Sequence, residues 1–189
     1  MRAFIAIEMS PEIRAELAER MASLRRAAGS VKWVEPHNIH MTLKFLGSVP
    51  DDLVPKMIER VRECCAATTP CDLELKGAGA FPNIGKPRVI FVDAKEDPAV
   101  LADLARRLDE AMCEFGVEPE ERGFKTHITL GRVRVPRPAP ELAEQLRGLR
   151  DVAFGRARIA EAVFMKSDLT PRGPVYTVIE RLTFSGTES

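Results

Sequence analysis

Two four-residue segments, HMTL at residues 40–43 and HITL at residues 127–130, are nearly identical in a chain that has only three histidines. Both lie in short runs that predict β-strands, HMTLKFLG and HITLGRV. Because successive side chains on a strand point to opposite faces, His40 and Thr42 should share one face, as should the corresponding pair on the second strand. The chain must therefore fold so that two equivalent strands present the same polar side chains.

The segments around these strands follow one order in both halves of the chain, namely helix, H-x-T-L strand, helix and further strands. Residues 10–29 predict the first helix, with Ser10 as N-cap, Pro11 in the first turn and Gly29 at its end. The other helices are predicted at 51–68, 97–116 and 138–149, and the other strands at 3–9, 31–35, 71–81, 88–94, 152–167 and 175–184. We therefore predict an α+β fold with two lobes related by an approximate two-fold axis, each an antiparallel sheet backed by helices.

Composition places the chain among ordinary globular proteins. With 189 residues, 45% of them hydrophobic and 30% charged, we expect one structural unit, residues 1–189, made of two interleaved lobes. No stretch is apolar over the length of a membrane span, and the opening residues reach Glu8 before a signal-peptide core could form, so we expect a cytoplasmic protein. The four cysteines lack a repeated C-x-x-C spacing, which favours free thiols over disulfides or a zinc site.

The formal net charge of zero argues against a protein that coats nucleic acid by bulk electrostatic attraction. The charge is nevertheless uneven, because the segment from Arg122 to Arg137 contains Lys125, Arg132 and Arg134 and no acidic residue. This basic segment includes the second H-x-T-L phrase, which argues against interpreting it as a solvated loop alone.

The two histidine–threonine pairs, brought together by the two-fold relation, would line a cleft between the lobes. Near neutral pH one imidazole can accept a proton while the other donates one, which suits in-line displacement at phosphorus. Hydroxyls and a cation would then hold the charge on the non-bridging oxygens. A metal site would ordinarily add carboxylates or a third histidine, so none is expected. One such pair alone is more often part of a core, but packing does not require the same polar pair twice.

Three further residues have two interpretations each, and a fourth, His37, has one. By strict alternation Phe45 lies on the apolar side and is predicted to be core unless the strand is bulged, with contact to a nucleobase as the alternative. Arg132 also falls on the apolar side, so a phosphate contact requires a bulge near Gly131. Trp33 could stack on a base, although packing is favoured, and His37 is predicted to lie at the surface or in a turn.

With these motifs the chain resembles the two-histidine (2H) phosphoesterase superfamily, and within it the RNA 2′,3′-cyclic phosphodiesterases, also called 2′-5′ RNA ligases. The resemblance spans nearly the whole chain, and the paired H-x-T-x motifs are its most specific part. It is carried by the segments MRAFIAIEM, VKWVEPHNIHMTLKFLG, FPNIGKPRVIFV, FKTHITLGRV and VFMKSDLTPRGPVYTVIERLTF.

The resemblance implies hydrolysis of a terminal RNA 2′,3′-cyclic phosphate to a 2′-phosphomonoester, in an active-site cleft between the lobes and without a cofactor. It implies that His40 donates a proton to the leaving 3′ oxygen, that His127 accepts a proton from water, and that the phosphate is contacted by Thr42, Thr129 and Arg132. The same pair with exchanged roles would join a cyclic phosphate to a 5′-hydroxyl in a 2′-5′ linkage. The expected partner is RNA with a cyclic phosphate end, tRNA fragments included, and the expected state is a monomer.

Two alternatives remain at this point. One is a binding module that recognises RNA ends or a nucleotide without turnover, although binding alone could dispense with a titratable pair. The other is an enzyme of the same class that acts on 2′-5′ oligonucleotides, ADP-ribose cyclic phosphate or a small cyclic nucleotide. Substrate choice of this kind is expected to depend on loops such as 79–88 and 134–140.

Overall fold

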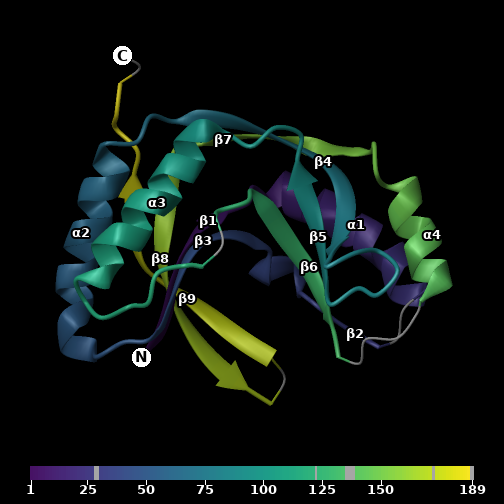
Figure 1. The fold of residues 1–189 in the computed structure, drawn as a ribbon, viewed down its shortest axis with the longest axis horizontal. Helices are drawn as coiled ribbons and strands as arrows, with labels where there is room; N and C mark the ends of the chain where they lie inside the picture. Colours follow the sequence, from purple (N-terminus) through teal and green to yellow (C-terminus); the bar gives the residue numbers. More distant parts are fainter. Residues whose placement is uncertain (28–29, 122, 135–138, 172, 188–189) are drawn as a thin grey trace.

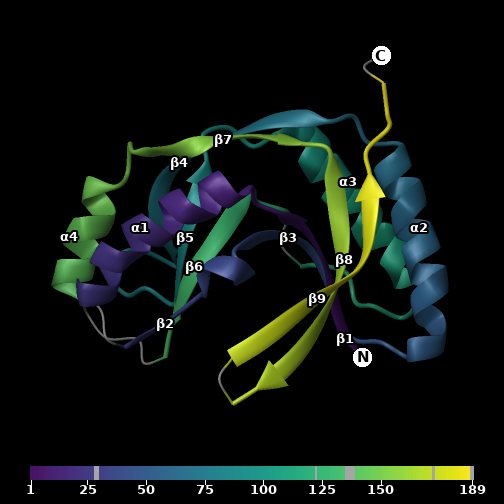
Figure 2. The same ribbon diagram turned by 180° about the vertical axis from the view of Figure 1, so that it is seen from behind.

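The computed structural model of the chain describes residues 1–27, 30–121, 123–134, 139–171 and 173–187. These residues form two antiparallel sheets with helices on their outer sides (Figure 1, and from behind in Figure 2). The predicted α+β architecture of two helix-backed antiparallel sheets is therefore confirmed. None of the described helices is long and apolar enough to cross a membrane.

The first sheet has the strand order β3-β1-β8-β9. Its strands are β1 (Arg2–Glu8), β3 (His40–Ser48), β8 (Glu161–Thr170) and β9 (Gly173–Thr183). The helices α2 (Val54–Ala66) and α3 (Ala99–Cys113) lie side by side against it (Figure 1). The ends of β8 and β9 form a hairpin that projects away from the rest of this lobe.

The second sheet has the strand order β2-β6-β5-β4-β7. Its strands are β2 (Val31–Trp33), β4 (Cys71–Phe81), β5 (Val89–Ala94), β6 (His127–Val133) and β7 (Ala153–Ile159). The helices α1 (Pro11–Ala27) and α4 (Pro140–Gly148) cover its outer side. Two single-turn 3₁₀ helices, Pro36–Asn38 and Asp51–Leu53, precede β3 and α2.

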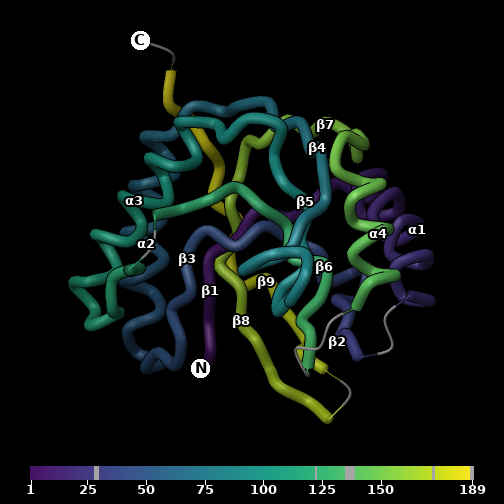
Figure 3. Tube along the Cα trace, turned by 45° about the vertical axis from the view of Figure 1, so that its right-hand side comes forward, coloured from purple at the N-terminus to yellow at the C-terminus, as the bar shows by residue number. Residues whose placement is uncertain are grey.

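Each lobe is assembled from both halves of the chain, which passes repeatedly from one lobe to the other (Figure 3). Helix α1 precedes β3 in sequence but packs against β7 and α4, whereas α3 precedes β6 and packs against β3 and α2. The strands β3 and β6, which carry the two H-x-T-L phrases, contact each other. Each of these helices thus packs in the lobe opposite to the H-x-T-L strand that follows it in sequence. The two H-x-T-L strands lie together at the junction of the lobes.

Most local predictions agree with the structure, and two differ for physical reasons. Ser10 caps α1, since its Oγ accepts a hydrogen bond from the Ile13 N–H at 3.3 Å. Helix α3 does not begin at Asp97, whose side chain instead accepts a hydrogen bond from the backbone N–H of Thr126 at 2.9 Å. The predicted strand 152–167 is divided at Ala160 into β7 and β8, which belong to different sheets.

The predicted helix end at Gly29 and residues 135–138 lie outside the described residues. The four cysteines are free, as predicted: Cys64, Cys65, Cys71 and Cys113.

The main core lies between the sheets and their helices. Leu101, Leu104, Leu108 and Met112, which recur at helical spacing, are fully buried on α3. Burial of each such side chain contributes about 1.5–3 kcal/mol relative to an exposed position. This packing fixes α3 against β3 and thereby supports the strand that carries His40.

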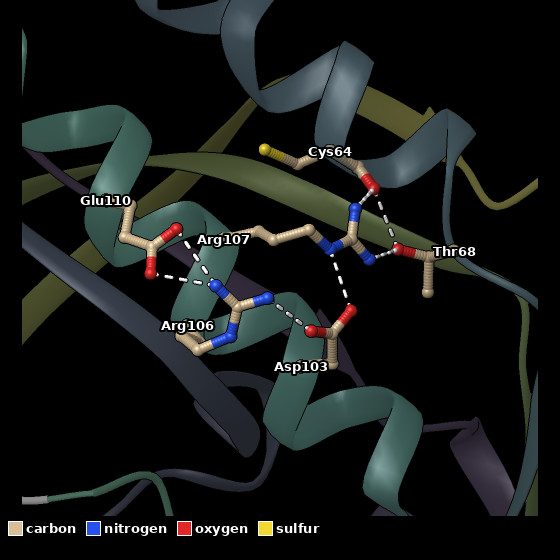
Figure 4. Close-up of polar contacts among 6 residues, drawn as sticks. All are labelled: Cys64, Thr68, Asp103, Arg106, Arg107 and Glu110. Atoms are coloured by element: carbon tan, nitrogen blue, oxygen red, sulfur yellow. Dashed lines mark hydrogen bonds and ion pairs between the residues drawn. The ribbon is translucent and has the colours of Figure 1, made fainter.

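A polar network joins α3 to the end of α2 (Figure 4). The Arg107 guanidinium donates to the backbone oxygen of Cys64 at 2.6 Å and to Thr68 Oγ1 at 2.8 Å, while its Nε donates to Asp103 at 2.9 Å. The last carbonyl groups of a helix have no partner within the helix. A cation at this end donates a hydrogen bond to one of them and interacts favourably with the negative end of the helix dipole. Arg107 therefore fixes where α2 ends relative to α3.

A buried lysine ties β3 to α3 and to the segment that follows it. The Lys44 side chain is 1% exposed, with its Nζ 2.6 Å from Asp109 Oδ1 and 2.7 Å from the backbone oxygen of Glu118. Asp109 also accepts a hydrogen bond from the backbone N–H of Glu120 at 3.1 Å. The ammonium group and the carboxylate thus hold a turn that has no other regular structure.

We predict that Lys44→Ala lowers the free energy of unfolding by about 3–5 kcal/mol, because Asp109 and the Glu118 carbonyl then lose a partner inside the protein. Lys44→Met keeps the apolar stem of the side chain and should cost less. Urea unfolding of both variants measures the difference. A loss below about 1 kcal/mol for Lys44→Ala would contradict a structural role for this ion pair.

Candidate active site

Both H-x-T-L strands carry a β-bulge at the leucine of the phrase. The pairing of β3 with β1 skips Leu43, and the pairing of β6 with β5 skips Leu130. At each bulge two successive residues are buried, Leu43 with Lys44 and Leu130 with Gly131. A bulge adds one residue to one strand, so every residue after it lies on the opposite face from the one that alternation assigns.

The bulges bring Phe45 and Arg132 to the faces that carry the histidines. Each lies five residues after its histidine, and each is exposed. Phe45 is 52% exposed, so its predicted place in the core is wrong, and the bulge is the reason. For Arg132 the bulge near Gly131 that a phosphate contact requires is present. The duplication therefore includes three positions on each strand rather than two.

The His40 ring is held in one tautomer by its two neighbours. Its Nδ1 lies 2.7 Å from the backbone oxygen of Asn38, which can only accept, so Nδ1 carries a proton and donates it. In the neutral ring Nε2 is then the acceptor, and the Thr42 hydroxyl donates to it at 3.1 Å. The arrangement leaves Nε2 as the nitrogen that gains or loses a proton.

Aromatic side chains enclose His40. The centroid of its ring is 5.0 Å from that of Phe4 and 5.3 Å from that of Tyr176, which meets it edge-on. This burial lowers the pKa of His40, while the hydrogen bond to Asn38 and the negative charge of Glu8 act in the opposite direction. His40 in the free protein therefore tends toward its neutral form.

His127 has an equivalent arrangement on the other sheet. Its Nδ1 donates to the backbone oxygen of Lys125 at 2.8 Å, again two residues upstream. Two aromatic rings, Phe81 and Phe91, lie at 5.6 and 5.8 Å from its ring. Within the described part of the chain no hydrogen-bond partner is found for Nε2, and Thr129 lies on the same face of the strand. Both imidazoles thus offer Nε2 for chemistry.

Each histidine also faces a carboxylate on the neighbouring strand, Glu8 on β1 and Asp93 on β5. Glu8 forms an ion pair with Arg181 at 2.6 Å, and Asp93 forms one with Lys125 at 2.7 Å. Each carboxylate is therefore largely neutralised by its own cation. At His40 the negative charge of Glu8 still acts to favour the imidazolium.

Electrostatic coupling connects the two lobes at this point. Burial raises the pKa of Tyr176, and the positive charges of Arg132 and Arg2 act to lower it. Arg132 belongs to β6 in the second sheet, whereas Tyr176 belongs to β9 in the first and touches His40. The positive charge of Arg132 thus acts on a neighbour of His40 across the boundary between the two sheets.

Trp33, His37 and the basic segment, which the sequence analysis also singled out, lie at different places around the two histidines. Trp33 is half-buried and packs over Gly131, where an added Cβ would lie 3.0 Å from its ring. His37 is exposed in the 3₁₀ turn before β3, as predicted. Of the basic segment, Lys125 lies beside His127 and Arg132 is exposed on the same strand face as His127, while Arg122 and Arg137 are outside the described residues. Among the residues that the structure describes, no cluster of three metal-binding side chains is present.

Phe45 also borders an open pocket at the end of β3. The pocket, of about 420 Å³, is lined by residues of the segment after β3, by Leu53 and Met57, and by Phe115 after α3. The Phe45 ring lies 6.2 Å from Phe4, which in turn packs on His40. The rings of Phe4 and Phe45 thus lie in a row between His40 and this pocket.

Sequence reasoning missed several neighbours of the two histidines: Phe4, Glu8, Phe81, Phe91, Asp93 and Tyr176. Tyr176 had one signal, since it is the chain's only tyrosine. The others are placed by strand register, which depends on the pairing of distant segments.

Comparison with known proteins identifies the family. The sequence profile of the 2′-5′ RNA ligase superfamily matches residues 11–170. The chain belongs to this superfamily. It is 37% identical over 180 residues to the RNA 2′,3′-cyclic phosphodiesterase of Methanothermobacter thermautotrophicus, which covers 95% of this chain and 97% of that protein.

Other members of the 2′-5′ RNA ligase superfamily agree in length and fold. The RNA 2′,3′-cyclic phosphodiesterase of Aquifex aeolicus is 33% identical over 98% of both chains. The crystal structure of TT0787 from Thermus thermophilus superposes on the whole chain with a TM-score of 0.82 at 33% identity, with 100% of both chains covered. The chain therefore has the extent and the fold of its superfamily relatives.

For this superfamily member we predict that His40 titrates below the ordinary imidazole value in the free protein, because burial disfavours the charged ring. Glu8→Gln should move the midpoint further down, because it removes the negative charge that favours the imidazolium. NMR titration of the His40 ring, assigned with His40→Gln, measures both midpoints. A midpoint that Glu8→Gln raises would contradict this electrostatic description.

Proposed function

We propose that this protein hydrolyses RNA 2′,3′-cyclic phosphate ends to 2′-phosphomonoesters, with His40 and His127 as the acid–base pair and residues 1–189 acting as one unit. The observation that carries the proposal is the duplicated geometry of the two imidazoles. Each donates Nδ1–H to the carbonyl two residues upstream, and each shares its strand face with a threonine. Superfamily membership supports the same chemistry, since the curated relatives are named RNA 2′,3′-cyclic phosphodiesterases.

The proposed step is a single in-line displacement at phosphorus. Water attacks the phosphorus atom as His127 Nε2 accepts its proton, and the bond between phosphorus and O3′ breaks as His40 Nε2–H protonates the departing oxygen. The product is a 2′-phosphomonoester with a free 3′-hydroxyl. The proton gained by His127 and the one lost by His40 then return to their starting positions through solvent.

The role of His40 as proton donor requires the charged ring, which burial disfavours in the free protein. An anionic phosphate bound beside the ring would favour the imidazolium, because an opposite charge within a few ångströms raises the pKa of a histidine. Glu8 acts in the same direction. Substrate binding would therefore favour protonation of His40 beside the oxygen that has to receive the proton.

The remaining site residues support phosphate and base binding. Thr42 and Thr129 provide hydroxyl donors on the two strand faces, and Arg132 provides a guanidinium that can hold two non-bridging oxygens. Phe45 offers an exposed ring next to the pocket at the end of β3, which suits contact with the base of the terminal nucleotide.

The same pair would also serve ligation, with the roles it has in hydrolysis and not the exchanged roles expected from the family resemblance. A 5′-hydroxyl in place of water would lose its proton to His127 and form a 2′-5′ phosphodiester as O3′ leaves. Because the cyclic phosphate ring supplies the activation, this ligation would need no nucleotide cofactor.

The test of this proposal is incubation of the purified protein, in chelator, with a short RNA that ends in a 2′,3′-cyclic phosphate. We predict a product with its phosphate on O2′, and a loss of about 10²–10⁴-fold in rate for His40→Ala and for His127→Ala with the fold retained. His37→Ala, at an exposed histidine in a turn, is the matched control and should keep the wild-type rate. Full activity in both site variants, or a phosphate on O3′, would contradict the proposal.

A further inference from the structure

Phe81, at the end of β4, is partly exposed to solvent beside His127. The rings of Phe81 and Phe91 stack with their centroids 4.2 Å apart and 20° between their planes. Phe91 is 5% exposed, whereas Phe81 is 37% exposed. Phe91 thus covers the inner face of Phe81, and the exposed area belongs to the rest of the Phe81 ring.

Two polar groups flank this stack. The His127 ring lies at 5.6 Å from Phe81 and 5.8 Å from Phe91, and the Lys125 Nζ lies at 5.7 and 5.3 Å from the same two centroids. A group at nearly equal distances from two stacked rings lies beside the stack, not over its outer end. Neither His127 nor Lys125 therefore covers the outer face of Phe81.

The surrounding backbone is shaped to hold the stack in place. A Cβ on Gly79 would lie 2.9 Å from Phe91 Cζ, so the Phe91 ring can cross β4 only because this residue is glycine. The carbonyl of Phe81 accepts a hydrogen bond from the Arg88 N–H at 2.7 Å, which closes the loop after β4. The exposed ring is thus part of a fixed structure.

The loop that follows Phe81 carries two exposed cations. Lys86 and Arg88 belong to the loop that joins Phe81 to β5, and both are exposed. Among the described residues neither has an ion-pair partner, whereas Lys125 is paired with Asp93. An aromatic face bordered by unpaired cations is the combination that binds single-stranded nucleic acid, through base stacking and phosphate attraction.

We propose that the outer face of Phe81 binds the base of a second nucleoside, the one whose 5′-hydroxyl takes the place of water beside His127. This proposal rests on the proposed function. In an in-line displacement the nucleophile and the leaving oxygen lie on opposite sides of phosphorus. The nucleoside of the cyclic phosphate lies on the His40 side, toward Phe45, so a base stacked beside His127 belongs to the nucleophile.

The step that this subsite serves is balanced in atoms and protons. The 5′ oxygen forms a bond to phosphorus and its proton passes to His127, while the bond from phosphorus to O3′ breaks and O3′ takes the proton of His40. The product is a 2′-5′ dinucleoside phosphate that contacts both Phe45 and Phe81. A ligand of this kind should therefore bind more tightly than a nucleoside 2′-monophosphate, which reaches only the Phe45 side.

The experiment compares the binding of these two ligands by titration calorimetry in a His40→Ala background, where turnover is suppressed. Phe81→Ala should weaken binding of the 2′-5′ dinucleoside phosphate by about 10- to 100-fold, the range expected for loss of one base–aromatic stack. It should weaken the nucleoside 2′-monophosphate at least tenfold less. Phe81→Trp should retain the preference for the dinucleotide, because it keeps an aromatic face.

Leu169→Ala is the matched control, since Leu169 is a more exposed apolar side chain, at 70%, on the β8–β9 hairpin. It should leave both affinities unchanged. The subsite is overturned if Phe81→Ala weakens both ligands equally or neither, or if the parent protein binds the dinucleotide no more tightly than the monophosphate. Failure of the proposed function would appear separately, as absence of cyclic phosphate hydrolysis by the wild-type protein.

Discussion

The site depends on one backbone feature that occurs twice, the β-bulge at the leucine of each H-x-T-L phrase. Without it, Phe45 and Arg132 would point toward the helices, and Lys44 would lie on the face of His40. With it, each strand presents a histidine, a threonine and a third residue that differs between the lobes. On the first sheet this third residue is Phe45, and on the second it is Arg132. The two equivalent strands therefore present different side chains beside their histidines.

The second constraint is electrostatic. Burial among aromatic rings disfavours the charged form of His40, while Glu8, whose own charge is compensated by Arg181, favours it. An unpaired carboxylate beside this ring would favour the imidazolium more strongly, and removal of the carboxylate would favour the neutral ring. The compensated pair leaves the protonation of His40 sensitive to a bound anion. A phosphate ester therefore influences the protonation of the ring that acts on it.

Much of this could be predicted from the sequence, because the signals were local. The leucines of α3, the cap at Ser10 and the repeated phrases follow from spacing and residue type. The division at Ala160 could not be predicted, since a run of alternating residues indicates one strand and gives no sign of a change of sheet. Strand register was equally invisible, so Glu8 and Asp93 were missed, and the burial of Lys44 depends on partners more than sixty residues away. Alternation failed at Phe45 because a bulge depends on the pairing strand as well as on its own residues.

In the proposed step proton transfer is divided between the two histidines, and leaving-group substitution tests this division most directly. A cyclic substrate with sulfur in place of O3′ has a leaving group that needs little protonation, so the acid becomes dispensable while the base does not. We predict that His40→Ala hydrolyses this substrate at a rate close to that of the wild-type protein, and that His127→Ala remains about 10²–10⁴-fold slower. Rescue of His127→Ala instead, or of neither variant, would contradict the assignment.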